Sequence, residues 1–434
     1  MAHKTFVIDT NVLLYDPESI TKFPRNHVVL PVTVLEELDK MKRFPNELGK
    51  NSRAVIRFLD SLKEIGTGNL HTGVTLENGS TIRIQLELKA DSKYNFSLSL
   101  NDNRIIFAAL LLQDKGEKVV FVSKDFAARI KAEAIGIEAE DYENLKYSYD
   151  SLYKGINKIE MPKHEIDTFY KDGKINVPDL KAYANEYLIM NSPENSTGVG
   201  RYDARHQTLD ALIKTGSIWG IKPRNVEQRC AVDLLLRDDI KLVSLMGPAG
   251  TGKTLLALAC ALHKVFDEGQ YSRILVSRPI VPLGRDIGYL PGTKEEKLFN
   301  WMQPIYDNLE FLCASTSGGG EGNETLKWVM ESKKIEMEAV TYIRGRTLPK
   351  MFMIIDEAQN LTPHEIKTII SRAGEGTKVV LAGDPTQIDN PYLDKDSNGL
   401  TYTVGKFIDQ KIYGHMFLDK TERSELAAIA ADIL

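Results

Sequence analysis

The 434-residue sequence has few cysteines and no long apolar stretch, and each of these absences excludes a class of protein. Its three cysteines, Cys230, Cys260 and Cys313, are widely spaced and form no metal-ligand pattern, which excludes a disulfide scaffold and a cysteine-based zinc site. Its longest apolar stretch, near residues 105–112, is much shorter than the roughly 20 residues that a membrane-spanning helix needs. No secretory leader is recognisable at the N-terminus. We therefore expect a cytoplasmic protein with no membrane partner.

A dominant charge of either sign is also missing. The 55 lysines and arginines are balanced by 60 aspartates and glutamates, which leaves a net charge of −5. Binding to nucleic acid would therefore need a local basic groove rather than the field of the whole molecule. The hydrophobic content of 42% is sufficient for buried cores, and the length suggests about three domains.

One segment matches a phosphate-binding turn at each position. It follows an apolar run at residues 242–246 and precedes a predicted helix at residues 255–262, the context that such a turn requires. Glycine N–H groups can face phosphate oxygens, Lys253 can reach the outer phosphates, and the Thr254 hydroxyl can ligate Mg²⁺. The turn consists of Gly247, Pro248, Ala249, Gly250, Thr251, Gly252, Lys253 and Thr254. The sequence therefore predicts binding of a nucleoside triphosphate.

Two later strands are predicted to end in polar residues that complete this site. The apolar run at residues 351–355 is followed by Asp356, which can hold Mg²⁺, and Glu357, which can orient or deprotonate an attacking water. The run at residues 378–382 delivers Asp384 and then Gln387, which is placed to sense the terminal phosphate. The sequence contains no N-K-x-D element for guanine, so we expect ATP rather than GTP.

The segments D-E-A-Q (356–359) and G-D-P-T-Q (383–387) resemble superfamily 1 helicase-type ATPases, and the resemblance implies that Gln228 reads adenine. The segments Arg278-Pro279, G-Y-L-P-G (288–292) and Y-I-R-G-R-T (342–347) narrow the resemblance to the PhoH family of ATPases, over residues 221–434.

True superfamily 1 helicases carry two such domains, whereas this sequence has one. The complementary arginine must then come from elsewhere in the chain or from a neighbouring subunit, and Arg423 is the first candidate. The alternative is that Arg423 is an ordinary exposed helix residue. An arginine from a neighbour would imply a homo-oligomer such as a ring.

Four acidic residues in the first third of the chain form a second set. Asp9 follows a strand at residues 5–8, and Asp125 follows a strand at residues 119–122. Glu37 flanks the apolar stripe of a predicted helix that Pro31 opens, whereas Glu36 points away, so we choose Glu37. Asp102 precedes an apolar helix. Asp102 and Asp125 could each merely cap a helix, and for Asp102 alone the cap is the favoured interpretation.

As a set, Asp9, Glu37, Asp102 and Asp125 resemble the PIN-domain nucleases in order and spacing. The resemblance implies an α/β/α fold in which the four acids hold Mg²⁺ or Mn²⁺, with Asp9 and Asp102 taking part in catalysis. The ion activates water for in-line attack on a phosphodiester, usually of RNA. Asn11 and Ser123 would support the ligands. The alternative is a PIN fold that binds or oligomerises without useful turnover.

Three regions follow from these patterns: a PIN-like α/β domain at 1–142, a connecting module at 143–220, and a P-loop ATPase domain with a mostly parallel sheet at 221–434. Residues 73–76 and 81–86 flank a turn and predict a hairpin at a sheet edge. The connecting module is expected to be irregular or β-rich. It interleaves aromatic and basic residues as a single-strand platform or an ordinary connector would: Tyr147, Tyr149, Tyr153, Lys154, Lys158, Tyr170 and Lys171.

Taken together, these resemblances imply an enzyme with two activities. It hydrolyses ATP to move along or unwind RNA, and it cuts RNA with a divalent metal ion. The expected partner is single-stranded RNA. The alternative is an ATP-dependent switch or scaffold in which the PIN domain serves only for docking.

Overall fold

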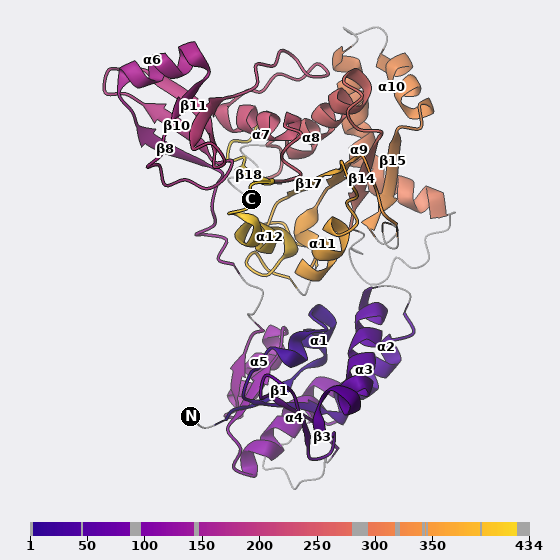
Figure 1. Ribbon diagram of the computed structural model, residues 1–434. Coiled ribbons are helices and arrows are strands. Elements are labelled where there is room, and N and C mark those ends of the chain that lie inside the picture. The colour runs from indigo at the N-terminus through magenta and orange to yellow at the C-terminus, as the bar shows by residue number, and fades with distance from the viewer. Residues whose placement is uncertain are drawn as a thin grey trace. The chain divides into compact units, whose positions relative to one another are not determined.

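The computed structural model describes residues 3–44, 47–86, 97–142, 147–279, 294–316, 322–340, 343, 346–390 and 393–422 (Figure 1). The chain forms two compact units, Met1–Leu145 and Lys146–Leu434. The described part of the predicted connecting module belongs to the second unit.

A seven-stranded sheet is the centre of the first unit, in the order β3-β4-β5-β2-β1-β6-β7. Its five strands from β5 to β7 are parallel, and β3 and β4 add antiparallel strands at one edge. β4 and β5 pair antiparallel, so the hairpin predicted at residues 73–76 and 81–86 is confirmed. The central strands are mostly apolar and, apart from His27, buried, as expected for parallel strands covered on both faces. The strands are β1 (Thr5–Ile8), β2 (His27–Pro31), β3 (Thr67–Asn69), β4 (Gly73–Thr75), β5 (Thr81–Gln85), β6 (Val119–Val122) and β7 (Glu138–Glu140).

Helices begin directly after three of these parallel strands. Asp9 caps the helix that follows β1, Pro31 precedes the helix after β2, and Asp125 caps the helix after β6. Asp9 and Asp125 therefore lie at the carboxyl edge of the sheet. The helices are α1 (Thr10–Tyr15), α2 (Val32–Met41), α3 (Glu47–Ile65), α4 (Asn101–Asp114) and α5 (Phe126–Ala134).

The second unit contains a six-stranded sheet in the order β15-β14-β16-β17-β13-β18, and every pairing between its described strands is parallel. The strands are β13 (Leu242–Met246), β14 (Arg273–Arg278), β15 (Ile335–Ala339), β16 (Met351–Ile355), β17 (Lys378–Gly383) and β18 (Tyr413–Phe417). The helices are α7 (Val226–Leu236), α8 (Lys253–Leu262), α9 (Lys294–Thr316), α10 (Gly322–Glu331), α11 (Pro363–Ile370) and α12 (Gly399–Phe407). The carboxyl ends of β13, β14, β16 and β17 meet at one edge, where a ligand site is expected.

A five-stranded sheet, β8-β10-β11-β12-β9, precedes α7 and belongs to the same unit. It surrounds a small core that includes Phe169, Leu188, Tyr202 and Leu209. Its elements are β8 (Ile156–Glu160), α6 (Lys163–Asp172), β9 (Lys174–Asn176), β10 (Tyr187–Asn191), β11 (Thr197–Asp203) and β12 (Thr208–Ala211). We call this part of the chain the β module.

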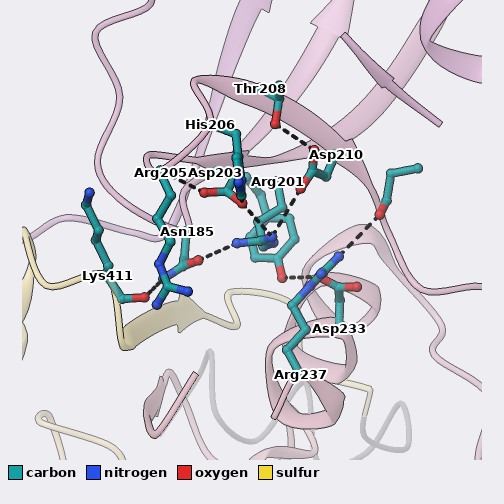
Figure 2. A network of polar contacts seen from close by, with 12 residues as sticks. Asn185, Arg201, Asp203, Arg205, His206, Thr208, Asp210, Asp233, Arg237 and Lys411 are labelled. Atoms are coloured by element: carbon teal, nitrogen blue, oxygen red, sulfur yellow. Dashed lines mark hydrogen bonds and ion pairs between the residues drawn. The ribbon is translucent and has the colours of Figure 1, made fainter. Parts of the chain in front are cut away.

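Buried polar contacts fix the β module to α7 and β18 (Figure 2). The Tyr187 hydroxyl donates to Asp233 Oδ2 at 2.7 Å, and Asn185 Nδ2 donates to the Tyr413 carbonyl at 2.7 Å. Arg201, which is 3% exposed, donates to the Asn185 side chain. These groups lose their hydration together, so separating the module would break the hydrogen bonds that compensate for that loss.

Most of the tyrosines singled out in this region pack against other side chains of the second unit, whereas Tyr170 is 64% exposed. Tyr147 packs against Tyr402 and Tyr149 against Phe417, with ring centroids 5.7 and 6.4 Å apart. The Tyr153 hydroxyl is buried. The Tyr170 hydroxyl donates to the Thr197 carbonyl at 2.9 Å. Most of these rings join the module to the larger sheet, as the connector alternative expects.

Lys378, at the start of β17, is fully buried and donates from Nζ to three main-chain carbonyls near the end of α7. The acceptors are Leu234, Arg237 and Ile240, at 2.9, 2.7 and 2.9 Å. Burial lowers the pKa of Lys378 to about 7. We expect Lys378→Met to leave the carbonyls unsatisfied and to lower the free energy of unfolding by about 3 kcal/mol.

This prediction can be followed by tryptophan fluorescence in urea, because Trp219, Trp301 and Trp328 all lie in the second unit. The control is Lys241→Met, a half-buried lysine directly before β13. Equal unfolding midpoints for the two variants would contradict the capping role of Lys378.

Candidate functional site

Three glycines of the phosphate turn between β13 and α8 adopt a backbone that other residues rarely do. Their φ angles are 142° at Gly247, 83° at Gly250 and 90° at Gly252. A Cβ atom on Gly247 would lie 2.0 Å from the Leu418 carbonyl oxygen, so only glycine fits there. The turn is thus built by local backbone chemistry and by the close approach of the chain after β18.

Two residues at the start of α8 face this turn. Lys253 is 9% exposed, and its Nζ donates to the carbonyls of Gly247 and Pro248 at 2.6 and 2.9 Å. Phosphate oxygens can replace these carbonyls as acceptors. Thr254 Oγ1 donates to Asp356 Oδ1 at 2.7 Å, so the turn meets the acidic end of β16. A hydroxyl and a carboxylate at this distance are the hard oxygen ligands that Mg²⁺ prefers.

The acid pair after β16 is held by a neighbouring arginine. Burial, followed by the charge of Glu357, raises the pKa of Asp356, and the charge of Arg278 acts in the opposite direction. Arg278 lies 3.3 Å from Asp356 Oδ2 and 3.1 Å from Glu357 Oε1. Glu357 has a φ of 53°, a left-handed conformation that is uncommon for non-glycine residues and that recurs at active sites. The sequence singled out Arg278 only as part of a family motif, although an arginine ending an apolar strand was a signal for it.

Gln359 links the acid pair to the end of β17. Its Nε2 donates to Glu357 Oε2 at 2.6 Å and to the Gln387 carbonyl at 2.8 Å, and its Oε1 accepts from the Asp384 amide at 3.0 Å. Gln387, which is exposed, donates from Nε2 to Asp384 Oδ2 at 2.9 Å. Sequence reasoning quoted Gln359 in the D-E-A-Q segment but gave it no role, because this connection depends on the sheet.

The remaining residues expected at this site differ in how far the structure describes them. Gln228 is 5% exposed; its Nε2 donates to the Thr251 carbonyl at 3.1 Å, and its Oε1 accepts from the Arg224 amide at 2.8 Å. Its amide thus contacts the phosphate turn directly. Arg423 lies outside the described residues. The amide of the preceding residue, Glu422, donates to the Gly250 carbonyl at 3.1 Å.

In the first unit, Asp9 is the most deeply buried of the four predicted acids. Its Oδ2 accepts from Ser123 Oγ at 2.6 Å and from Asn11 Nδ2 at 2.8 Å, and its Oδ1 accepts from the Thr10 amide at 2.6 Å. Burial raises the pKa of Asp9 to about 7, and the negative charges of Asp102 and Glu37 add to this rise. A cation bound nearby would relieve this cost.

Glu37 is connected to the Asp9 region, and Glu36 is not. Asn101 Nδ2 donates to Glu37 Oε1 at 2.8 Å, and the Thr10 hydroxyl donates to Glu37 Oε2. Glu36 is exposed and pairs with Arg104 at 3.2 Å. The difference arises because adjacent positions on a helix point about 100° apart.

Asp102 and Asp125 have different local roles. The N-cap of α4 is Leu100, without a side-chain cap hydrogen bond, so the interpretation of Asp102 as a helix cap is wrong. Asp125 does cap α5, because its Oδ1 accepts from the amides of Ala127 and Ala128 at 2.7 and 3.3 Å.

The structure therefore brings the charges of Asp9, Glu37 and Asp102 together and uses Asp125 in a cap. Within the described ranges, no group of three or more histidine, cysteine, aspartate or glutamate side chains is arranged to hold a metal ion. The oxygen donors of Asp9 and Glu37 nonetheless suit Mg²⁺ or Mn²⁺ in type. Over the same described residues, no helix is long and apolar enough to cross a membrane.

Comparisons with known proteins identify both units. Residues 6–143 match the PIN domain family, and residues 220–433 match the family of PhoH-like proteins. The expected fold class, a PIN-type domain followed by a P-loop domain with a mostly parallel sheet, is confirmed. The sequence is 47% identical to Protein PhoH2 of Bacillus subtilis, over 99% of this chain and all of that one. It is 33% identical to Protein PhoH2 of Mycolicibacterium smegmatis, over 100% of this chain and 97% of that one. The chain therefore belongs to the PhoH2 family, with a PIN domain at its N-terminal end and a PhoH-like domain at its C-terminal end.

Proposed function

We propose that the protein is an ATP-dependent RNA-processing enzyme that combines RNA-stimulated ATP hydrolysis with metal-dependent cleavage of phosphodiester bonds. One observation carries the proposal. The same chain contains a phosphate turn that is hydrogen-bonded to the acidic end of β16 and, in its other unit, a buried carboxylate, Asp9. The ATPase would supply unwinding or translocation, and the PIN domain would supply the cut.

In the ATPase, Lys253 binds the outer phosphates and leaves the carbonyls that it now contacts. Thr254 and Asp356 would hold Mg²⁺, which would neutralise charge on the phosphates. Glu357 accepts the proton of the attacking water, and Gln387 reports on the terminal phosphate. Gln228 reads adenine, and Arg423 or an arginine of a neighbouring subunit completes the charge stabilisation.

In the PIN domain, Asp9, Glu37, Asp102 and Asp125 would hold Mg²⁺ or Mn²⁺, and the ion would supply an activated water for attack on the phosphodiester. Ser123 and Asn11 orient the Asp9 carboxylate through the hydrogen bonds described above. Asp125 caps α5 through Oδ1, so its Oδ2 would be the oxygen that binds the ion. Single-stranded RNA is the proposed partner, and we place the protein in the cytoplasm as a homo-oligomer.

A second function has one observation in its favour. The predicted acids of the PIN domain are not arranged as a ready metal site within the described residues. The protein would then be an ATP-driven switch or scaffold, in which the PIN domain binds its partner without cutting it.

One experiment separates the two. Single-stranded and tailed-duplex RNA and DNA of defined sequence are incubated with the protein and Mg²⁺ or Mn²⁺, with and without ATP. The proposed enzyme cleaves RNA only with metal, and its ATP turnover rises with RNA. ATP turnover that RNA does not change, together with intact RNA, would support the switch and overturn the enzyme.

The raised pKa of Asp9 predicts how metal binding depends on pH. The folded, metal-free protein retains a proton on Asp9 up to about pH 7, and this proton competes with the ion. We expect Mn²⁺ affinity to rise about tenfold per pH unit below pH 7 and to level off above it. Free Mn²⁺, measured by electron paramagnetic resonance without nucleotide, tests this. Asp9→Asn should bind weakly and lose the pH dependence. An affinity that does not change with pH in the wild type would contradict the prediction.

A further inference from the structure

Arg278 is the last residue of β14, and its guanidinium contacts three separate groups. Nε lies 3.3 Å from Asp356 Oδ2, and Nη2 lies 3.1 Å from Glu357 Oε1. Nη1 donates to the main-chain carbonyl of Trp301, in α9, at 3.1 Å. The side chain is 17% exposed. A planar guanidinium can make these contacts at once, whereas a lysine ammonium would have to choose among them.

Two of these contacts are with Asp356 and Glu357, the carboxylates that the proposed ATP hydrolysis uses. Asp356 Oδ1 already accepts from Thr254, and Arg278 lies against its other oxygen. Both oxygens of Glu357 are engaged, one with Arg278 and the other with Gln359. Arg278 is thus the counter-ion of the acid pair in this state. A Mg²⁺ ion beside Asp356 would compete with Arg278 for this carboxylate, because the two cations repel each other.

The third contact, with the Trp301 carbonyl, connects the acid pair to helix α9. Trp301 precedes Pro304, which lies inside α9 and has no N–H for the helix hydrogen bonds. Arg278 therefore binds α9 in the turn that Pro304 interrupts, where a helix is most easily bent. Any movement of Arg278 away from the acid pair changes its bond to this turn.

We propose that Arg278 couples the nucleotide site to α9: when Mg²⁺ and ATP bind, Arg278 leaves Asp356 and Glu357, and the environment of Trp301 changes with it. Arg278 is then a positioning residue, which holds Glu357 until nucleotide is present. The inference rests on ATP binding at the phosphate turn, as proposed above. α9 becomes the element through which nucleotide state is passed on.

The tryptophans of the chain allow a direct test. Trp219 is nearly buried in the core, and Trp328 is 56% exposed on α10. Replacing both by phenylalanine leaves Trp301 as the sole tryptophan, which is excited selectively beyond the absorption of tyrosine. Emission is recorded while a non-hydrolysable ATP analogue is added with Mg²⁺, or with EDTA in place of Mg²⁺. Binding of the analogue is measured separately by equilibrium dialysis.

In this background we expect Trp301 emission to change on binding with Mg²⁺ and to change little with EDTA. Arg278→Ala should lose the change while still binding the analogue, and Arg278→Lys, which keeps the charge, should retain part of it. The matched control is Arg346→Ala. Arg346 also lies close to two acids, Glu336 and Glu338, but these are on β15. The Arg346→Ala variant should show the same change in Trp301 emission as the protein without this substitution.

The outcomes distinguish this inference from the proposed function. If the analogue does not bind the wild type, the proposed ATPase fails and the inference falls with it. If the analogue binds but emission does not change, the coupling is wrong although the ATPase stands. An equal response in Arg278→Ala, Arg346→Ala and the wild type, or an equal response with EDTA, would overturn the role of Arg278.

Discussion

Lys253→Ala is expected to lower the turnover number for ATP hydrolysis by about 100-fold or more. Lys253 lies at the start of α8 and reaches back over the phosphate turn, where its Nζ is held by two carbonyls that phosphate oxygens can replace. The alanine removes the positive charge that faces the phosphates in the transition state. Release of inorganic phosphate, with and without RNA, measures the loss.

The control for this change is Lys327→Ala, because Lys327 is 75% exposed on α10. It should hydrolyse ATP as the wild type does. A Lys253→Ala protein with near-normal turnover, and with an unchanged far-ultraviolet circular dichroism spectrum, would exclude the phosphate turn as the site of hydrolysis.

The second large effect is expected at Asp9. Asp9→Asn should lower the rate of RNA cleavage by about 100-fold or more, because a neutral amide is a poor ligand for a divalent ion. The substitution keeps the shape of the side chain, so the contact with Ser123 can persist. Cleavage of a labelled single-stranded RNA in excess Mn²⁺ measures the effect, and ATP turnover should stay unchanged.

Glu37 and Glu36 provide a matched pair for this prediction. They are neighbours on α2, yet only Glu37 accepts from Asn101 and Thr10 near Asp9. Glu37→Gln should therefore reduce cleavage strongly, whereas Glu36→Gln should not. Equal cleavage by Asp9→Asn and the wild type would contradict the proposed nuclease activity and favour the alternative, an ATP-driven switch whose PIN domain does not cut RNA.

The central strands could be predicted closely from the sequence. β1, β6 and β16 begin and end at the predicted residues, because each is a short, continuous apolar run between polar residues. β15 and β18 were missed. β15 lies at the edge of its sheet and carries two glutamates, and β18 contains tyrosine, glycine and histidine. The alternation of apolar residues and glutamates in β15 is the pattern of a half-buried strand and could have revealed it, whereas the composition of β18 is not typical of a strand.

The sequence by itself determined those features that depend only on a few neighbouring residues in one segment of the chain. The glycines of the phosphate turn, the carboxylates after β1 and β16, and the cap at Asp125 all follow from local backbone geometry and strand-to-helix order. Only the tertiary structure decided which side chains meet across long separations. Arg278 contacts Glu357 from 79 positions away, Lys378 caps α7 from 138 to 144 positions away, and Tyr147 and Tyr149 pack rather than stand exposed. Such contacts depend on the register of a parallel sheet and on burial, and neither is encoded in the spacing of residues along one segment.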